Sequence, residues 1–260
     1  MPADRRCLSF RRAPVTPAGR SASGTEEWTD GTIRESMKPW ETLDTTTVDG
    51  TTLTLARHDR EFLIVADTVP LMSSRTHGSE DALATAGCRH AGGLPAPCVL
   101  VGGLGMGFTL RVALDVLPSA ATVIVAELVP AVVAWNRGVL GPLAGHPLDD
   151  PRVRVVERDV AEVLRGEPGR FDAALLDIDN GPSALTSHRN TDLYTDRGIA
   201  RARAALRPGG TLAVWSTGPD RQFVRRLRSA GFDVTLERAR GHRGAGPKHL
   251  IFLAQRPASI

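Results

Sequence analysis

Two aspartates stand directly behind an apolar run in the stretch LLDIDNGP, residues 175–182. A carboxylate that ends a buried strand lies at the edge of a sheet, where ligands bind, and not in the packed core. Two carboxylates in that place can attract an ammonium group and remove one of its protons, which is the work of a general base. We therefore predict that Asp177 is a catalytic base and that Asp179 is its positioning partner. A hydrogen bond to the backbone of the turn is the alternative role for Asp179.

A glycine-rich segment, VLVGGLGMGFTL, lies between an apolar strand and a helix at residues 99–110. Such glycines let the backbone approach a ligand closely and leave the N–H groups of the helix free to bind it. Glu127 ends the next apolar strand, where an acidic side chain accepts hydrogen bonds from ribose hydroxyls. We expect Gly103, Gly105, Gly107 and Glu127 to bind a nucleoside. A tight turn from strand to helix is the alternative reason for the glycines.

The next two strands indicate which nucleoside this is. Asp159 follows the strand VRVVE (153–157) and suits the amino group of an adenine, although it could instead cap the next helix. A nicotinamide enzyme has no need of paired acids after the following strand. The segment LRPGG (206–210) then completes the order usual in methyltransferase-like sheets. The pattern therefore favours an adenosyl sulfonium over a dinucleotide.

These residues need a sheet to position them, and the pattern from Val99 onward predicts one. Apolar strands alternate with helices of about ten or more residues, which indicates an α/β, Rossmann-type, mainly parallel sheet with helices on both faces. The last two strands flank the polar stretch RARGHRGAGPK (238–248) and predict a late antiparallel hairpin. Residues 42–71 carry short β-rich pieces separated by turn pairs, which predict a small antiparallel unit of three or four strands.

Four parts of the chain follow from these patterns. Residues 1–36 are rich in Arg, Ser, Pro and Gly and predict a disordered tail, with translation beginning at Met37 as the alternative. Residues 37–75 form the expected β-stranded N-terminal domain, and residues 76–98 a gate helix and linker. Ser79 is the expected N-cap of that helix, because acidic residues follow it. Residues 99–260 form the methyltransferase-like domain.

Composition excludes several other classes of protein. The 260 residues carry a net charge of +3, a single tyrosine and no clustered basic face, which argues against nucleic-acid binding. Three cysteines without C-x-x-C spacing predict no metal site and fit a reduced, cytoplasmic setting. No apolar run approaches the roughly 18 residues that a membrane span needs, so we expect no membrane partner. Exposed strands of the N-terminal unit are compatible with a homodimer.

From about Thr42 to Arg256, the sequence resembles the spermidine and spermine synthases, or aminopropyltransferases. The likeness rests on VLVGGLGMGFTLR, VAELVPAVVAWNRGVL, DDPRVRVVERDV, FDAALLDIDNGP and LYTDRG. It implies that the glycine loop and Glu127 hold decarboxylated S-adenosylmethionine, that Asp159 binds the adenine and that Asp177 is the catalytic base. It also implies transfer of an aminopropyl group to a small-molecule amine, a polyamine such as putrescine.

The acceptor side departs from the pattern of that family. We expect Glu80, His77 and Tyr194 to line it, with a structural role as the alternative for His77 and Tyr194. The family's tyrosine and polar neighbour before the glutamate are replaced here by Gly78 and Ser79.

The donor side departs from the family at Met106, which stands where the family carries an aspartate that binds the donor's ammonium. Without that acid, the carboxylate of ordinary S-adenosylmethionine would no longer meet a like charge. A methyltransferase that uses S-adenosylmethionine is therefore the second hypothesis, and a non-catalytic nucleotide-binding relative is the third.

Overall fold

The computed structural model describes residues 39–178, 182, 190–242 and 245–258. The predicted tail at residues 1–36 and the predicted partner Asp179 lie outside these residues. The chain divides into a unit of residues 1–37 and a unit of residues 38–260, and every element described lies in the second unit. The domain boundaries expected near residues 75 and 98 stay predictions. Within the described ranges, no helix is long and apolar enough to cross a membrane.

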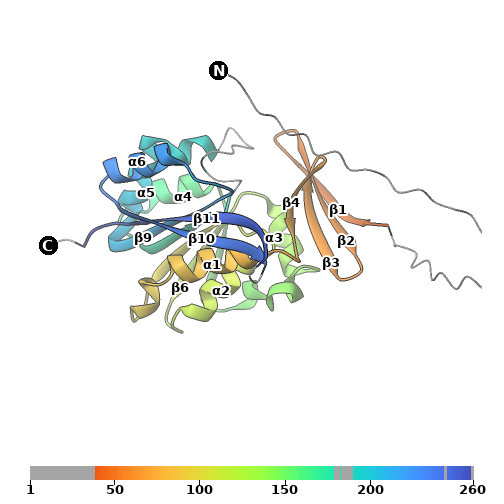
Figure 1. Ribbon diagram of the computed structural model, residues 1–260. Coiled ribbons are helices and arrows are strands. Elements are labelled where there is room, and N and C mark those ends of the chain that lie inside the picture. Colours follow the sequence, from red (N-terminus) through yellow and green to blue (C-terminus); the bar gives the residue numbers. More distant parts are fainter. Residues whose placement is uncertain (1–38, 179–181, 183–189, 243–244, 259–260) are drawn as a thin grey trace, which may run out of the picture. The chain divides into compact units, whose positions relative to one another are not determined.

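Four strands of the described chain form an N-terminal antiparallel sheet in the order β1-β2-β3-β4 (Figure 1). Their bounds are β1 Glu41–Val48, β2 Thr51–His58, β3 Glu61–Ala66 and β4 Val69–Ser73. Each connecting turn begins with an aspartate at positive φ, a conformation that Asp tolerates better than most residues: Asp49, Asp59 and Asp67. The small antiparallel unit predicted from the turn pairs is therefore confirmed.

Seven strands of the described chain form the second sheet, in the order β10-β11-β9-β8-β5-β6-β7. Their bounds are β5 Cys98–Gly102, β6 Thr122–Glu127, β7 Val153–Glu157, β8 Phe171–Leu176, β9 Leu206–Ser216, β10 Asp233–His242 and β11 Ala245–Gln255. Strands β9, β8, β5, β6 and β7 run parallel to one another, whereas β11 pairs antiparallel with both β9 and β10. The predicted mainly parallel sheet with a late antiparallel hairpin is confirmed.

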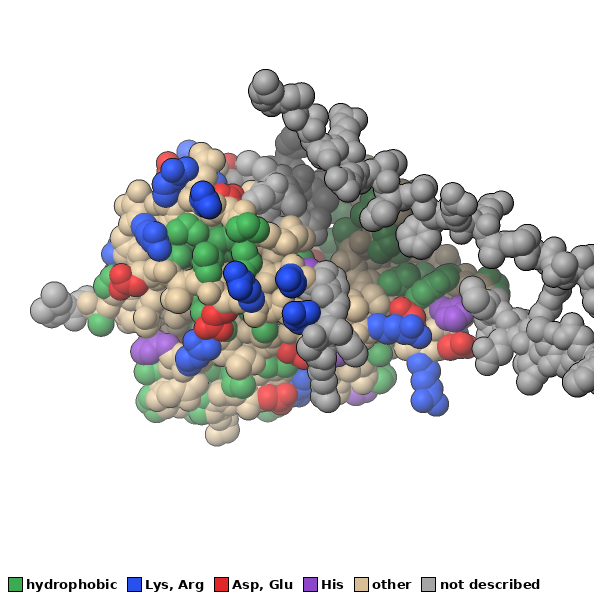
Figure 2. All heavy atoms as spheres, in the orientation of Figure 1, with side chains coloured by type: hydrophobic (Ala, Val, Ile, Leu, Met, Phe, Trp, Pro, Cys, Tyr) green, Lys and Arg blue, Asp and Glu red, His purple; other side chains and the backbone are tan. Residues whose placement is uncertain are grey.

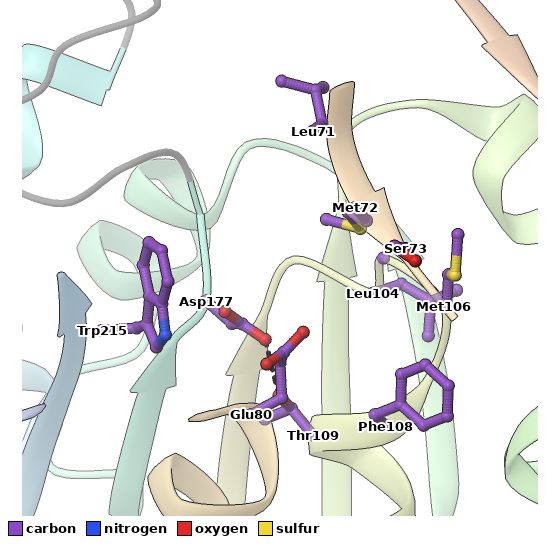
Figure 3. Close-up of a pocket in the computed structure, with 11 residues that line it drawn as sticks. Leu71, Met72, Ser73, Glu80, Leu104, Met106, Phe108, Thr109, Asp177 and Trp215 are labelled. Atoms are coloured by element: carbon purple, nitrogen blue, oxygen red, sulfur yellow. Dashed lines mark hydrogen bonds between the residues drawn. The ribbon is translucent and has the colours of Figure 1, made fainter. Parts of the chain in front are cut away.

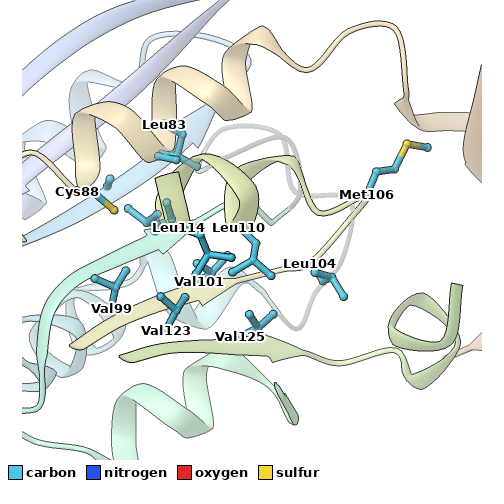
Figure 4. Packing of buried hydrophobic residues seen from close by; sticks show 14 of the residues in the cluster. Leu83, Cys88, Val99, Val101, Leu104, Met106, Leu110, Leu114, Val123 and Val125 are labelled. Atoms are coloured by element: carbon cyan, nitrogen blue, oxygen red, sulfur yellow. The ribbon is translucent and has the colours of Figure 1, made fainter. Parts of the chain in front are cut away.

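Helices cover both faces of the seven-stranded sheet (Figure 1). Their bounds are α1 Gly78–Gly87, α2 Phe108–Val116, α3 Pro130–Arg137, α4 Val160–Gly166, α5 Asp196–Ala205 and α6 Arg221–Ser229. Helices α1, α2 and α3 share one buried cluster with Val99 and Val101, and helices α4, α5 and α6 share another with Leu100. Figure 4 shows the two valines of β5 beside Leu110 and Leu114 of α2. Because both faces of the sheet are buried at β5, the sequence of this strand is continuously apolar and does not alternate with polar residues.

The N-terminal sheet packs against the first of these clusters. Leu55 and Ile64 from its strands are buried in the same cluster as α1, α2 and α3. Trp135 of α3 donates a hydrogen bond from Nε1 to Oδ2 of Asp44 in β1 at 2.7 Å. The antiparallel sheet is therefore joined to the parallel one by apolar packing and by a side-chain hydrogen bond.

Helix α1 begins earlier than its sequence indicates, and Ser79 is not its N-cap. The N-cap position is His77, whose side chain does not cap the helix, and the hydroxyl of buried Ser79 donates to Oε2 of Glu80 at 2.6 Å. A Cβ on Gly78 would lie 2.7 Å from the carbonyl oxygen of Arg240 in β10. This close approach of α1 to β10 fixes the start of the helix through tertiary contact, and the prediction for Ser79 is wrong.

Basic side chains on the described surface are spread among acidic and apolar ones on the face drawn in Figure 2. Helix α6 gives an example, because it buries Phe223 and Leu227 while Arg221, Arg225 and Arg228 are exposed. These arginines form the polar face of an amphipathic helix, which is their ordinary structural role.

Candidate active site

The loop between β5 and α2 needs glycine both for its backbone conformation and for close contacts. Gly103, Gly105 and Gly107 have φ values of +86°, +54° and +83°. A Cβ on Gly103 would lie 2.5 Å from the carbonyl oxygen of Asp177, and a Cβ on Gly105 would lie 2.8 Å from Sδ of Met72. The loop therefore lies against the end of β8 on one side and against β4 on the other.

Glu127, at the end of β6, holds this loop in place through a hydrogen bond to its backbone. Its Oε2 accepts a hydrogen bond from the backbone N–H of Leu104 at 2.9 Å, and its Oε1 accepts one from the N–H of Val129 at 2.8 Å. Burial raises the pKa of Glu127, and these hydrogen bonds oppose the rise. The backbone N–H groups of Leu128 and Gly105 oppose the rise as well, so four backbone groups surround this carboxylate. The sequence analysis predicted that Glu127 binds a ligand, and it did not predict that Glu127 holds the loop.

Asp159 follows β7 and is the N-cap of α4. Its Oδ1 accepts a hydrogen bond from the N–H of Ala161 at 2.8 Å. The capping role, which was the structural alternative in the sequence, is therefore present in the structure. Contact with an adenine stays a prediction, and capping leaves the second carboxylate oxygen available for it.

A cavity of about 120 Å³ lies beside the glycine loop (Figure 3). Its volume is below the roughly 300–1,000 Å³ of typical small-molecule sites, so it suits the reacting arm of a ligand rather than a whole nucleoside. Polar and apolar side chains share its wall, which consists of Leu71, Met72, Ser73, Glu80, Leu104, Gly105, Met106, Phe108, Thr109, Asp177 and Trp215.

Asp177 and Glu80 point toward each other across this cavity (Figure 3). Oγ1 of Thr109 donates a hydrogen bond to Oδ2 of Asp177 at 2.6 Å. Burial raises the pKa of Asp177 to about 6, and the hydrogen bond from Thr109 opposes the rise. Burial, together with the negative charge of Asp177, raises the pKa of Glu80 to about 7. The two carboxyl groups therefore titrate near neutral pH, where a general base works best.

The raised pKa of Glu80 gives stability a pH dependence whose sign is fixed. The folded protein holds this proton more tightly than the unfolded chain, so the free energy of unfolding falls as pH rises from about 4.5 to about 7. We expect Glu80→Gln to raise the free energy of unfolding at pH 8, by on the order of 2 kcal/mol, and to change it little at pH 4. Urea unfolding of both proteins at the two pH values measures this difference.

Glu162→Gln is the matched control, because Glu162 is exposed on α4. Its substitution should leave the pH dependence of unfolding as in the wild type. If Glu80→Gln left that dependence unchanged as well, Glu80 would not be a source of the pH effect.

Two predicted residues of the acceptor side lie outside this cavity. The ring of His77 stacks on Phe108 with ring centroids 4.1 Å apart, and its Nδ1 contacts the carboxylate of Asp81 at 3.1 Å. His77 lines a second, more open cavity next to β2 and β3. The hydroxyl of Tyr194 is 3.3 Å from the carbonyl oxygen of Ile178, to which it donates, and the side chain is buried in the core. Asp177 and Glu80 therefore line the same cavity, whereas His77 and Tyr194 are not among the residues that line it.

Thr109 and Trp215 line the cavity, and the sequence analysis did not single them out. Thr109 comes two residues after the last glycine of the loop, so its position in the first turn of α2 was a usable signal. Trp215 stands near the end of β9, the strand beside β8, and an aromatic residue there was a weaker signal. Among the described residues, no group of three or more His, Cys, Asp or Glu side chains could hold a metal ion.

The sheet order, the glycine loop and the site at the carboxyl ends of parallel strands define a methyltransferase-like fold. Comparisons with known proteins narrow this class. No protein-family model matches the chain. The polyamine aminopropyltransferase of Mycobacterium tuberculosis (strain ATCC 25618 / H37Rv) is 34% identical over 149 residues, which are 54% of this chain and 28% of that protein. The matched region thus spans less than a third of the length of this curated relative.

Two solved structures share the fold over most of the chain. The spermidine synthase of Thermotoga maritima superposes with a TM-score of 0.67 at 18% identity, over 84% of this chain and 74% of that one. A spermidine synthase in complex with the transition state analogue AdoDATO gives a TM-score of 0.65 at 18% identity, over 84% and 73% of the two chains. The resemblance seen in the sequence is confirmed: part of the chain is similar in sequence to polyamine aminopropyltransferases, and most of it shares the fold of spermidine synthases.

Proposed function

We propose that the protein transfers an aminopropyl group from decarboxylated S-adenosylmethionine to an amine such as putrescine, with Asp177 as the general base. The observation that carries this proposal is the buried pair of Asp177 and Glu80, which lies beside a glycine loop of the nucleoside-binding type. The similarity to polyamine aminopropyltransferases supports it, although the similar region covers only part of those proteins.

In this proposal the donor lies over the ends of β5, β6 and β7. Gly103, Gly105 and Gly107 allow its nucleoside to approach the backbone, Glu127 accepts hydrogen bonds from the ribose hydroxyls and Asp159 accepts one from the adenine amino group. The sulfonium supplies a neutral thioether as leaving group. The protein therefore has to align the acceptor and remove its proton, and alignment can contribute roughly 7 to 11 kcal/mol.

The carboxylate pair performs the second task. The acceptor arrives as an ammonium ion, which the negative charge of the pair attracts. Asp177 removes one proton, and the hydrogen bond from Thr109 fixes the orientation of its carboxylate. The neutral nitrogen then attacks the carbon next to sulfur: a C–N bond forms, the C–S bond breaks, and its electron pair stays on sulfur. Glu80 balances the positive charge that the nitrogen acquires.

A second candidate function is methyl transfer from S-adenosylmethionine, and Met106 favours it. Met106 is 3% exposed, and Leu71, Met72 and Leu104 join it in an apolar wall beside the loop. An ammonium placed against this wall without a charged partner would cost several kcal/mol. Aminopropyl transfer therefore requires the donor's ammonium to find a partner elsewhere, whereas methyl transfer does not.

Donor binding separates these functions. We expect Met106→Asp to raise the affinity for decarboxylated S-adenosylmethionine relative to S-adenosylmethionine by at least about tenfold, because a carboxylate pairs with the ammonium of the first and repels the carboxylate of the second. Isothermal titration calorimetry with both donors measures the ratio, and Met106→Asn is the uncharged control.

Turnover by the wild-type protein decides the group transferred. Mass spectrometry of putrescine incubated with each donor in turn should show the mass of an aminopropyl addition with decarboxylated S-adenosylmethionine. A methyl addition would support the second candidate. Binding of both donors without turnover would overturn both, and would leave the hypothesis of a non-catalytic nucleotide-binding relative.

A further inference from the structure

The indole N–H of Trp215 is an unused hydrogen-bond donor in the wall of the cavity. Its Nε1 is buried and has no hydrogen-bond partner among the described residues. The other hydroxyl donors of the wall are used, because Thr109 donates to Asp177 and Ser73 donates to Glu61. A buried donor without an acceptor costs about 1–3 kcal/mol, so a ligand that supplies an acceptor there gains affinity.

The position of Trp215 in the sheet assigns it to the acceptor side. Strand β9 flanks β8 on the side away from β5, so the glycine loop, Asp177 and Trp215 come from three neighbouring strands in that order. Leu176 of β8 pairs with Val214 of β9, which places the next residues, Asp177 and Trp215, at the same height. Asp177 therefore lies between the donor loop and the indole.

A residue of β11, which flanks β9 on the side away from β8, holds the ring of Trp215 in place. The ring packs at a tilt of 31° on the imidazole of His249 in β11, with ring centroids 4.7 Å apart. This contact orients the indole, so the direction of its N–H is set before a ligand binds.

We propose that Trp215 donates a hydrogen bond to a neutral oxygen of the acceptor, so that the protein prefers an amine that also carries a hydroxyl or carbonyl group to an unsubstituted diamine. This inference rests on the proposed transfer to an amine. An ammonium has donors only, and the lone pair of the deprotonated nitrogen is needed for attack on carbon, so the reacting nitrogen cannot serve the indole. A carboxylate is disfavoured because Asp177 and Glu80 would repel it.

The test compares amines that differ at one end. Calorimetry of the full chain with 3-amino-1-propanol and with n-butylamine contrasts a hydroxyl with a methyl group of similar size, and putrescine supplies the diamine. One hydrogen bond corresponds to an affinity difference of about five- to tenfold. We expect the wild-type protein to bind the amino alcohol more tightly than the other two by this factor, and Trp215→Phe to reduce the ratio to about one. Trp40→Phe, at an exposed tryptophan, should keep the wild-type ratio.

Each other outcome identifies what is wrong. If the wild-type protein binds the three amines equally, the inference is overturned and the proposed function stands; this comparison needs no variant to fold. If the preference persists in Trp215→Phe, the indole is not its source. If the wild-type protein binds none of the amines, the inference and the amine acceptor of the proposed function both fail.

Discussion

Asp177→Asn is expected to lower turnover by at least about a hundredfold while the affinity for the donor stays within about threefold of the wild type. Asparagine keeps the size of the side chain and an oxygen that can accept the hydrogen bond from Thr109, but it cannot take a proton at neutral pH. A general base contributes about 10² to 10⁴ in rate, which sets the size of the loss. Product formation followed by mass spectrometry measures turnover, and calorimetry measures donor affinity.

Asp233→Asn is the matched control, because Asp233 is exposed at the start of β10. It should keep the wild-type rate. Full activity of Asp177→Asn would place the base elsewhere. Loss of donor affinity together with rate would instead indicate that the substitution disturbs the glycine loop, because the backbone N–H of Asp177 donates to the carbonyl oxygen of Gly102 at 2.9 Å.

Glu127→Ala is expected to weaken donor binding by at least about a hundredfold and to lower the free energy of unfolding by about 2–4 kcal/mol. The carboxylate accepts hydrogen bonds from the N–H groups of Leu104 and Val129. Its removal leaves the buried N–H of Leu104 without an acceptor, at about 1–3 kcal/mol, and the part-buried N–H of Val129 at a smaller cost, and it frees the loop that holds the nucleoside. Donor titration and urea unfolding of the same preparations measure the two effects.

Glu157→Ala is the control for this substitution, since Glu157 is the exposed residue that pairs with Glu127 in the neighbouring strand β7. It should change neither donor affinity nor stability appreciably. A Glu127→Ala variant that loses stability but binds the donor normally would show that Glu127 holds the loop without contacting the ligand.

The fold could be predicted because its signals are local. Strand β5 is apolar throughout and β8 is apolar except for Asp172, and the lengths of the intervening segments indicate helices, so a mainly parallel sheet follows from the sequence. The glycine loop and the acids at strand ends were predicted for the same reason. Each of these features is set by a few consecutive residues.

The composition of the cavity could not be predicted from local patterns, because it depends on contacts between distant segments. Glu80 was expected on the acceptor side only through the family resemblance, and the structure sets it opposite Asp177 (Figure 3), while Asp179 lies outside the described residues. That pairing follows from the close packing of α1 on β8 and β9, where a Cβ on Gly87 would clash with the side chains of Leu175 and Ala213. Nothing in the local pattern of α1 specifies this contact.

Strand β4 gives the protein a way to change its selectivity without changing its chemistry. Met72 of β4 lies over Gly105, and Leu71 completes the same wall, yet β4 is an edge strand and Leu71 is 44% exposed. The base and the nucleoside loop belong to the buried parallel sheet, where substitutions are costly. Mutations at the exposed edge destabilise the fold less, so evolution can reshape the space around the transferred group while the residues of the reaction centre stay unchanged.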